Sequence, residues 1–167
     1  NWLAFYGELE DVLGEDRAFV EGMNASLASQ YSYLARHLEK DLLANHYFEN
    51  LKALVLGALY FGDEDTLAIA FPLLESQVCE QVLPDGMHFE LSPMYHKIIL
   101  EDVLRVVASL EKNGNDLGEL GICVQRMCDC LYSLERNTNR TPLFNDSGDN
   151  VAKHKDALLA CAKERFG

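Results

Sequence analysis

Residues 47–58 read YFENLKALVLGA, and this stretch decides the class of fold. Its apolar residues recur at the three- and four-residue spacing of one helical face. They are Tyr47, Leu51, Leu54, Val55 and Ala58. Further apolar residues occupy most of the other positions, so we expect a helix that is buried on most sides.

The same spacing recurs on both sides of this stretch, along nearly the whole chain. The other apolar stripes span residues 2–13, 19–34, 67–78, 99–110, 120–134 and 158–162. Turn-forming residues separate them at 62–65, 84–86, 113–115 and 141–150, and no alternating strand pattern of useful length occurs. We therefore predict an all-α fold of about seven helices in antiparallel hairpins. Pro72 is expected to kink its helix or to start a new one.

Length and charge exclude several classes of protein. With 167 residues, 49% hydrophobic and 25% charged, the chain can build a sizeable core, and we expect a single helical domain over residues 1–167. Twenty-seven acidic residues against fourteen basic ones give a net charge of −13. That balance argues against a general nucleic-acid partner and against a polybasic membrane-surface module. No apolar stretch approaches the ~20 residues that span a bilayer.

The cysteines and the first residues carry less information. Five cysteines show no metal-ligand pattern, and we expect them to be buried apolar side chains. Cys128 and Cys130 lie two positions apart on an expected helix, so they point to different sides and should not bridge each other. The chain opens on Asn1 with no Met and no signal-like segment, so we expect it to be a piece of a longer protein.

Polar residues precede the most apolar helix. Asn45 suits the N-cap of a helix that restarts after an earlier one ending near Leu43. His46 beside it is either a hydrogen-bonded structural residue or a functional one. Glu49 follows three positions later on the same face, where it could orient the imidazole or be solvated.

Residues 84–96, PDGMHFELSPMYH, form the second chemically rich stretch. Residues 84–86 predict a turn. Ser92 and Pro93 predict a helix start, with Ser as the N-cap and Pro as the first helical residue. Tyr95 then falls in the first turn of that helix. It is either an amphipathic residue of a capped helix or part of a site to which the nearby histidines and carboxylates belong.

These stretches resemble the helical domain of the heparinase II/III-type polysaccharide lyases. The matching runs, in order, are NHYFENLKAL (45–54), FGDE (61–64), LPDG (83–86), HFE (88–90), SPMYH (92–96), LED (100–102) and PLFNDS (142–147). Asn1-Trp2 and residues 36–39 are compatible with the same pattern. The similarity is greatest to the uronic-acid lyases and exopolysaccharide-cluster members of the group.

The resemblance implies an incomplete (α/α) toroid, followed in the whole enzyme by a β-sandwich region that lies outside these 167 residues. It implies eliminative cleavage of an acidic, uronate-containing polysaccharide. It also implies a periplasmic or cell-envelope location, although this segment itself carries no localisation signal. No cofactor is expected within the segment, since the family's metal, like a further catalytic histidine, belongs to the sandwich region. The helical segment alone could therefore bind substrate without turning it over.

Site residues follow from the same resemblance. Asn45 matches the residue that neutralises the substrate carboxylate, and its amide can donate hydrogen bonds without protonating a nearby base. Tyr95 matches the catalytic tyrosine, which acts as acid and, for some stereochemistries, also as base. His46 matches the histidine that assists at the carboxylate or acts as base. The expected substrate contacts are Arg36, Glu49 and His88.

Other functions stay open at this stage. The acidic charge favours a less charged uronate exopolysaccharide over heparin as the substrate. A glycoside hydrolase on a similar scaffold would need two carboxylates about 5–9.5 Å apart, and Glu49, Asp85 and Glu90 are the candidates. A non-catalytic helical scaffold that binds carbohydrate or protein is the third possibility.

Overall fold

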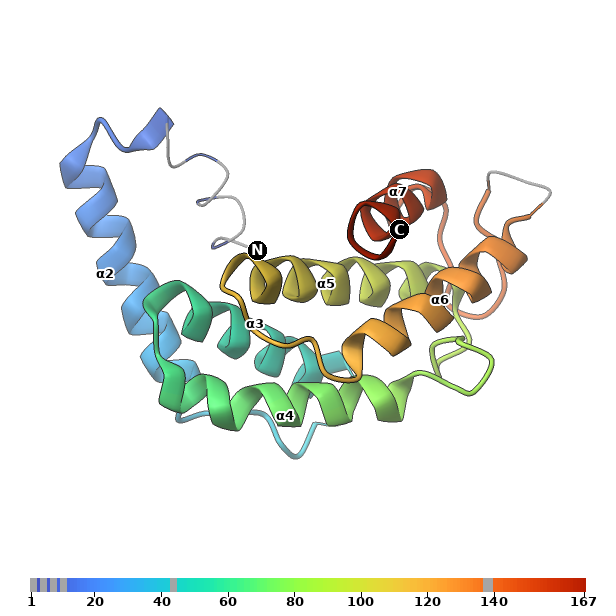
Figure 1. Cartoon of the computed structure of the whole chain (residues 1–167), viewed down its shortest axis with the longest axis horizontal. Coiled ribbons are helices and arrows are strands. Elements are labelled where there is room, and N and C mark those ends of the chain that lie inside the picture. The colour runs from blue at the N-terminus through green and yellow to red at the C-terminus, as the bar shows by residue number, and fades with distance from the viewer. Residues whose placement is uncertain (1–2, 4–5, 7–8, 10–11, 43–44, 137–139) are drawn as a thin grey trace. The chain divides into compact units, whose positions relative to one another are not determined.

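The computed structural model describes residues 3, 6, 9, 12–42, 45–136 and 140–167. This part of the chain contains six helices and no named strand (Figure 1). The helices are α2 (Arg17–Leu34), α3 (Asn45–Phe61), α4 (Glu64–Gln81), α5 (Pro93–Lys112), α6 (Leu120–Leu134) and α7 (Lys155–Phe166). Each covers one of the predicted apolar stripes, so the all-α prediction is confirmed for these residues.

The first predicted stripe, residues 2–13, is described only in part. Trp2 and Phe5 lie outside the described residues. Tyr6 is buried, as the stripe requires, whereas Leu9 and Val12 are exposed. The expected burial is therefore wrong for Leu9 and Val12.

The chain divides into two compact units at Pro72, residues 1–72 and 73–167. Pro72 lies inside α4, which runs without a break from Glu64 to Gln81. The alternative that this proline starts a new helix is thus wrong. The expectation of a single domain over residues 1–167 stays a prediction.

In the N-terminal unit, α2 packs against α3 through Tyr31. The Tyr31 ring lies 5.4 Å from that of Phe61, and a Cβ added at Gly57 would come within 2.4 Å of the Tyr31 ring. The Tyr31 hydroxyl donates to Asp63 Oδ2 at 2.8 Å. Asp63 also accepts the backbone N–H of Thr66 and so caps α4. These hydrogen bonds, that from the Thr66 backbone first, lower the pKa of Asp63.

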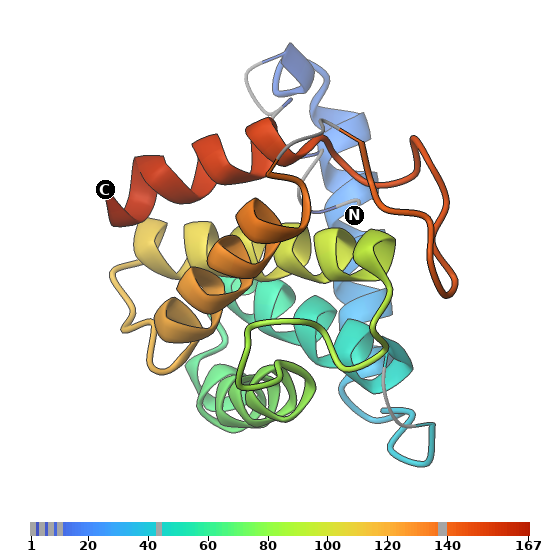
Figure 2. The same cartoon turned by 90° about the vertical axis from the view of Figure 1, so that its right-hand side faces the viewer.

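The C-terminal unit is built around α5, which contacts both α6 and α7 while these two also contact each other (Figures 1 and 2). Its largest fully buried apolar side chains are Leu74, Leu100, Leu104, Leu110, Leu120, Met127, Leu131 and Leu158. They come from α4, α5, α6 and α7, so these helices share one core. Burying aliphatic side chains of this size stabilises a fold by about 1.5–3 kcal/mol each relative to leaving them exposed.

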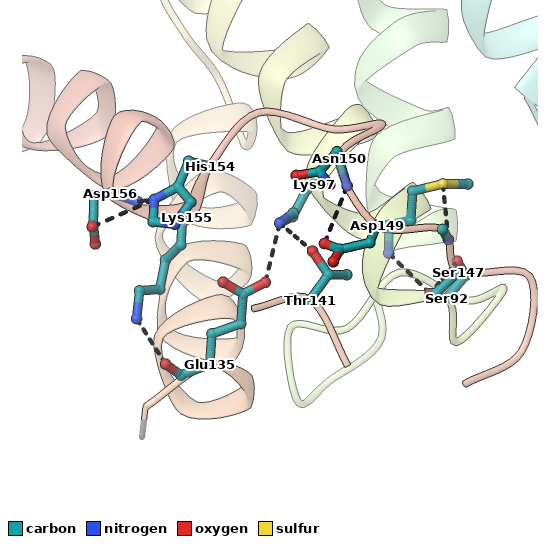
Figure 3. Close-up of polar contacts among 12 residues, drawn as sticks. Ser92, Lys97, Glu135, Thr141, Ser147, Asp149, Asn150, His154, Lys155 and Asp156 are labelled. Atoms are coloured by element: carbon teal, nitrogen blue, oxygen red, sulfur yellow. Dashed lines mark hydrogen bonds and ion pairs between the residues drawn. The ribbon is translucent and has the colours of Figure 1, made fainter. Parts of the chain in front are cut away.

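A buried ion pair ties α5 to the end of α6. The Lys97 ammonium lies 3.1 Å from Glu135 Oε1 and donates to Thr141 Oγ1 at 2.6 Å (Figure 3). Lys155, at the start of α7, donates to the backbone carbonyl of Glu135 at 2.7 Å. Both Lys97 and Glu135 are almost fully buried. A buried charge is tolerated only with a partner, so this cluster holds the start of the loop after α6 in one place.

Residues 82–92 fold back onto the end of α4. The Gly86 N–H donates to the Leu83 carbonyl at 2.8 Å, which closes the predicted turn, and Phe89 N–H donates to the Gln81 carbonyl at 2.8 Å. Gly86 has φ +85°, and a Cβ there would lie 2.1 Å from the Arg126 carbonyl oxygen. Only glycine allows α6 to approach the turn this closely.

Candidate functional site

Asn45 is the first residue of α3, and its side chain is half-buried. The expected earlier helix ending near Leu43 is not observed in the described residues, because α2 ends at Leu34 and residues 35–42 form turns and loop. Leu43 itself lies outside the described residues. A loop rather than a helix therefore leads towards Asn45.

Glu39, in that loop, lies beside His46. Its Oε2 is 3.6 Å from His46 Nδ1. Asn50, one turn further along α3, accepts the Glu39 N–H at 2.9 Å and donates to Glu39 Oε2 at 3.3 Å. The loop is thereby fastened to α3, and its carboxylate is held next to an imidazole whose side chain is 68% exposed.

Glu49 and Arg36 are the other predicted residues of the N-terminal unit. Glu49 pairs with the buried Lys52, whose Nζ lies 2.6 Å from Glu49 Oε2. The sequence left open whether Glu49 orients His46, and the structure adds Glu39 as a carboxylate beside that ring. Arg36 is exposed in the turn after α2, with its backbone N–H donating to the Tyr33 carbonyl at 3.1 Å.

Tyr95 lies in the first turn of α5 in the C-terminal unit. Ser92 is the N-cap and Pro93 the first helical residue, as predicted. Ser92 Oγ accepts the Tyr95 backbone N–H at 3.3 Å. The Tyr95 side chain is partly exposed, whereas Ser92 is buried. The phenol is thus carried by a capped, well-packed helix start.

A second serine reaches the same turn from the loop after α6. Ser147 Oγ lies 3.0 Å from Ser92 Oγ and accepts the Met94 backbone N–H at 3.2 Å (Figure 3). In Figures 1 and 2 this loop runs beside the N-terminal end of α5. The PLFNDS run therefore meets the SPMYH run, although about fifty residues separate them.

His88 is fully buried. A buried side chain cannot contact a substrate, so the expected role of His88 as a substrate contact is wrong for this structure. Its Nε2 lies 3.2 Å from Gln81 Oε1, and its backbone N–H donates to His96 Nδ1 at 3.2 Å. Burial, and then the charge of nearby His96, lower the pKa of His88 to about 4. The ring is a neutral part of the core beneath the loop, and the prediction is corrected on this ground.

A polar pocket of about 520 Å³ lies in the C-terminal unit. It is lined by Lys97, Arg140, Thr141, Asp149, Asn150, Ala152 and His154. The lining offers both hydrogen-bond donors and acceptors, which suits a hydroxylated or acidic ligand. No sequence pattern singled out this pocket, because its residues come from α5 and from a loop without periodicity.

The predicted catalytic residues are divided between the two units. Asn45 and His46 belong to the N-terminal unit and Tyr95 to the C-terminal one. Within each unit they occupy the first turn of a helix and have partly or largely exposed side chains. Their convergence on one surface stays a prediction.

Comparison with known proteins decides the family. The sequence profile described as Heparinase II/III N-terminus matches residues 17–164. The chain belongs to this family. The resemblance inferred from the Asn45 and Tyr95 motifs is therefore confirmed.

Two comparisons with heparinase relatives agree with this assignment. A heparin-sulfate lyase from Pedobacter heparinus is 27% identical over 125 residues, which is 66% of this chain and 19% of that protein. A crystal structure of a heparan sulfate lyase HepC mutant, also from Pedobacter heparinus, is 26% identical with a TM-score of 0.64. The match covers 80% of this chain and 22% of that structure. The chain thus spans about a fifth of the length of these relatives and shares their all-α heparinase II/III fold in this part.

Two kinds of feature are absent from the described part of this heparinase-family chain. No group of three or more His, Cys, Asp and Glu residues there could hold a metal ion. None of its helices is both long and apolar enough to cross a membrane. The expectation that the segment holds no cofactor stays a prediction.

Proposed function

We propose that this chain forms the helical part of the catalytic cleft of a polysaccharide lyase that cleaves a uronate-containing polysaccharide by β-elimination. The observation that carries the proposal is the placement of Asn45 and Tyr95 in a chain of the heparinase II/III family. Asn45 is the first residue of α3 and Tyr95 lies in the first turn of α5, each in the motif that the family resemblance identifies. The alternatives are a non-catalytic binding scaffold and a glycoside hydrolase.

The chemical problem is the weak acidity of the uronate C5 proton. A base removes this proton, the electrons form the C4–C5 double bond, and the C4–O bond to the leaving sugar breaks. An acid then protonates the leaving oxygen. The negative carboxylate opposes the build-up of carbanion character at C5, so hydrogen bonds or positive charge must neutralise it.

The residues of this chain fit those steps. Asn45 would donate its amide hydrogens to the carboxylate, which stabilises the developing charge. Tyr95 would protonate the leaving oxygen and, for one C5 epimer, also take the C5 proton. An unperturbed phenol has a pKa of about 10, so its use as a base requires nearby positive charge when substrate is bound.

Glu39 would orient His46 in this scheme. A carboxylate 3.6 Å from Nδ1 favours the tautomer that carries its proton there. The Nε2 lone pair is then available to accept a proton. His46 would act as the base for the epimer that Tyr95 does not serve, or would assist at the carboxylate when protonated.

The charge of the chain bears on the substrate. The Pedobacter relatives are named as lyases of heparin or heparan sulfate. A net charge of −13 opposes a highly sulfated polymer except where the cleft is locally basic. We therefore propose a less charged uronate exopolysaccharide as the substrate.

The test uses the full-length protein with two groups of acidic polysaccharides, unsulfated and sulfated. Wild-type protein is expected to release oligosaccharides with a C4–C5 double bond, detected by ultraviolet absorbance. Tyr95→Phe and Asn45→Ala should each lower kcat by about a hundredfold or more, because each removes a group whose interaction with the substrate is stronger in the transition state than in the ground state.

Tyr132→Phe is the matched control, since Tyr132 is an exposed tyrosine of α6 in the same unit as Tyr95. It should leave kcat unchanged. Wild-type activity that survives Tyr95→Phe would contradict the catalytic assignment. Oligosaccharide binding without any turnover would favour the scaffold alternative.

A further inference from the structure

We propose that Ser147, assisted by Asn145, is a positioning residue for Tyr95, acting through the first turn of α5. This inference rests on the proposed function, which makes Tyr95 a catalytic residue. The two loop residues contact the backbone around Tyr95 and leave its phenol to the substrate.

The first backbone N–H groups of a helix have no partner inside the helix. In α5, Pro93 has no N–H, the Tyr95 N–H is accepted by Ser92 Oγ, and the His96 N–H is accepted by the Ser92 carbonyl at 2.8 Å. Only the Met94 N–H is left without a local acceptor. Ser147 Oγ accepts it at 3.2 Å. The cap of α5 is therefore complete only with a residue from a distant loop.

Ser147 also supports the local cap itself. Its Oγ lies 3.0 Å from Ser92 Oγ, so one hydroxyl donates to the other. Ser92 is almost fully buried, and a buried hydroxyl needs its partner. Loss of the Ser147 hydroxyl would leave both the Met94 N–H and the Ser92 hydroxyl short of a hydrogen bond.

Backbone strain occurs at the same contact. Leu91 and Asn145 have φ of +54° and +50°, a left-handed conformation that is unfavourable for a residue with a side chain like that of leucine. Asn145 Nδ2 donates to the Leu91 carbonyl at 2.7 Å and so holds the strained residue. Gly148 N–H lies 3.3 Å from Met94 Sδ. Residues 145–148 are thus hydrogen-bonded to residues 91–94, which directly precede Tyr95.

These hydrogen bonds hold the first turn of α5 in place and so position the Tyr95 phenol. Tyr95 directly follows Met94, so a shift or fraying of the first turn displaces the tyrosine ring relative to a bound sugar. A displacement of about 1 Å at a reacting group can lower the rate about a hundredfold. Positioning of this kind affects kcat more than KM, because the binding residues elsewhere in the cleft are unchanged.

The experiment compares Ser147→Ala with Ser147→Thr in the full-length protein, with Ser133→Ala as the matched control. Threonine keeps the hydroxyl. The Ser133 hydroxyl donates to the Asp129 carbonyl on the exposed side of α6. Ser147→Ala is expected to lower kcat about ten- to a hundredfold with KM within about twofold, and Ser147→Thr to restore most of the rate.

A second readout does not depend on turnover. Amide hydrogen exchange at Met94 and Tyr95 should become about fivefold faster or more in Ser147→Ala, and the ring resonances of Tyr95 should shift. Asn145→Ala should act in the same direction. Ser133→Ala should change none of these quantities.

The outcomes separate this inference from the proposed function. Unchanged exchange and unchanged Tyr95 resonances in Ser147→Ala would overturn the positioning role, whatever the activity. A loss of activity that follows only the fraction of unfolded protein would overturn it as well. Altered exchange and resonances in a protein that shows no lyase activity would support the positioning of Tyr95 while contradicting the proposed function.

Discussion

The backbone N–H of His88 donates to Nδ1 of His96 at 3.2 Å, and both side chains are fully buried. Since Nδ1 of His96 is an acceptor, the ring proton is on Nε2, which faces the Met127 carbonyl at 3.0 Å. Protonation of His96 would place a second N–H against that of His88. Burial lowers the pKa of His96 to about 4, as it does for His88.

We therefore predict that acid destabilises the C-terminal unit below pH 6.5. Unfolded histidines bind protons near pH 6.5, whereas these two bind them near pH 4 when folded. The free energy of unfolding should be constant above pH 7 and fall between pH 6.5 and 5 by about 2 kcal/mol per histidine. Urea unfolding across this range measures it. A flat curve, or imidazole resonances that titrate near pH 6.5, would contradict the prediction.

The buried Lys97–Glu135 pair predicts a strong dependence on both partners. Lys97→Met leaves the Glu135 carboxylate buried without its cation and should lower the free energy of unfolding by about 3–5 kcal/mol. The double variant Lys97→Met/Glu135→Leu should lose less, because neither charge of the pair stays buried. Urea unfolding of Lys97→Met, Glu135→Leu and the double variant gives the coupling free energy between the two side chains. Losses of the two single variants that simply add up in the double variant would contradict the prediction.

Gly86 and Gly114 form a matched pair of glycines with positive φ. A Cβ at Gly86 would lie 2.1 Å from the Arg126 carbonyl oxygen, whereas nothing lies within 4 Å at Gly114. Gly114→Ala should cost about 1 kcal/mol from backbone strain alone. Gly86→Ala should cost about 2–5 kcal/mol, because the turn must also move away from α6. Thermal unfolding of both variants checks the difference, and equal losses would mean that the close approach is unimportant.

Cys79 and Cys123 should differ in reactivity although their sulfur atoms lie only 3.6 Å apart. Burial, followed by the hydrogen bond with Cys79, raises the pKa of Cys123 to about 12. Cys79 is exposed and Cys128, Cys130 and Cys161 are half-buried, so the expectation of buried cysteines is confirmed only for Cys123. Iodoacetamide at pH 8 should therefore alkylate Cys79 first, and Cys123 only after unfolding. Peptide mass spectrometry measures the order in which the two cysteines are alkylated. Equal labelling of Cys79 and Cys123 in the folded protein would contradict the prediction.

Helical periodicity predicted the described helices correctly because each has an apolar face that packs in a core. The start of α5 was also predictable, since the Ser92–Pro93 pair satisfies a helix N-terminus from local sequence alone. The restart of α3 was predicted less well. We expected a helix that ends near Leu43, whereas α2 ends at Leu34 and a loop leads towards Asn45.

Contacts between distant loops and helices were beyond prediction. Glu39 lies beside His46 in a loop that Asn50 also contacts, and Ser147 reaches Met94 from another loop. Neither pair has a spacing that local periodicity could reveal. His88 misled for a different reason, since its hydrogen-bonding groups are satisfied inside the core and a polar residue in a motif need not face the solvent.

Product chemistry tests the central claim, eliminative cleavage of a uronate polysaccharide, most directly. We would incubate the full-length protein with unsulfated uronate oligosaccharides and determine product masses. We predict a new non-reducing-end fragment that is lighter by one water than the hydrolysis product and absorbs in the ultraviolet. Fragments with the full hydrolytic mass would contradict it and would favour a glycoside hydrolase instead.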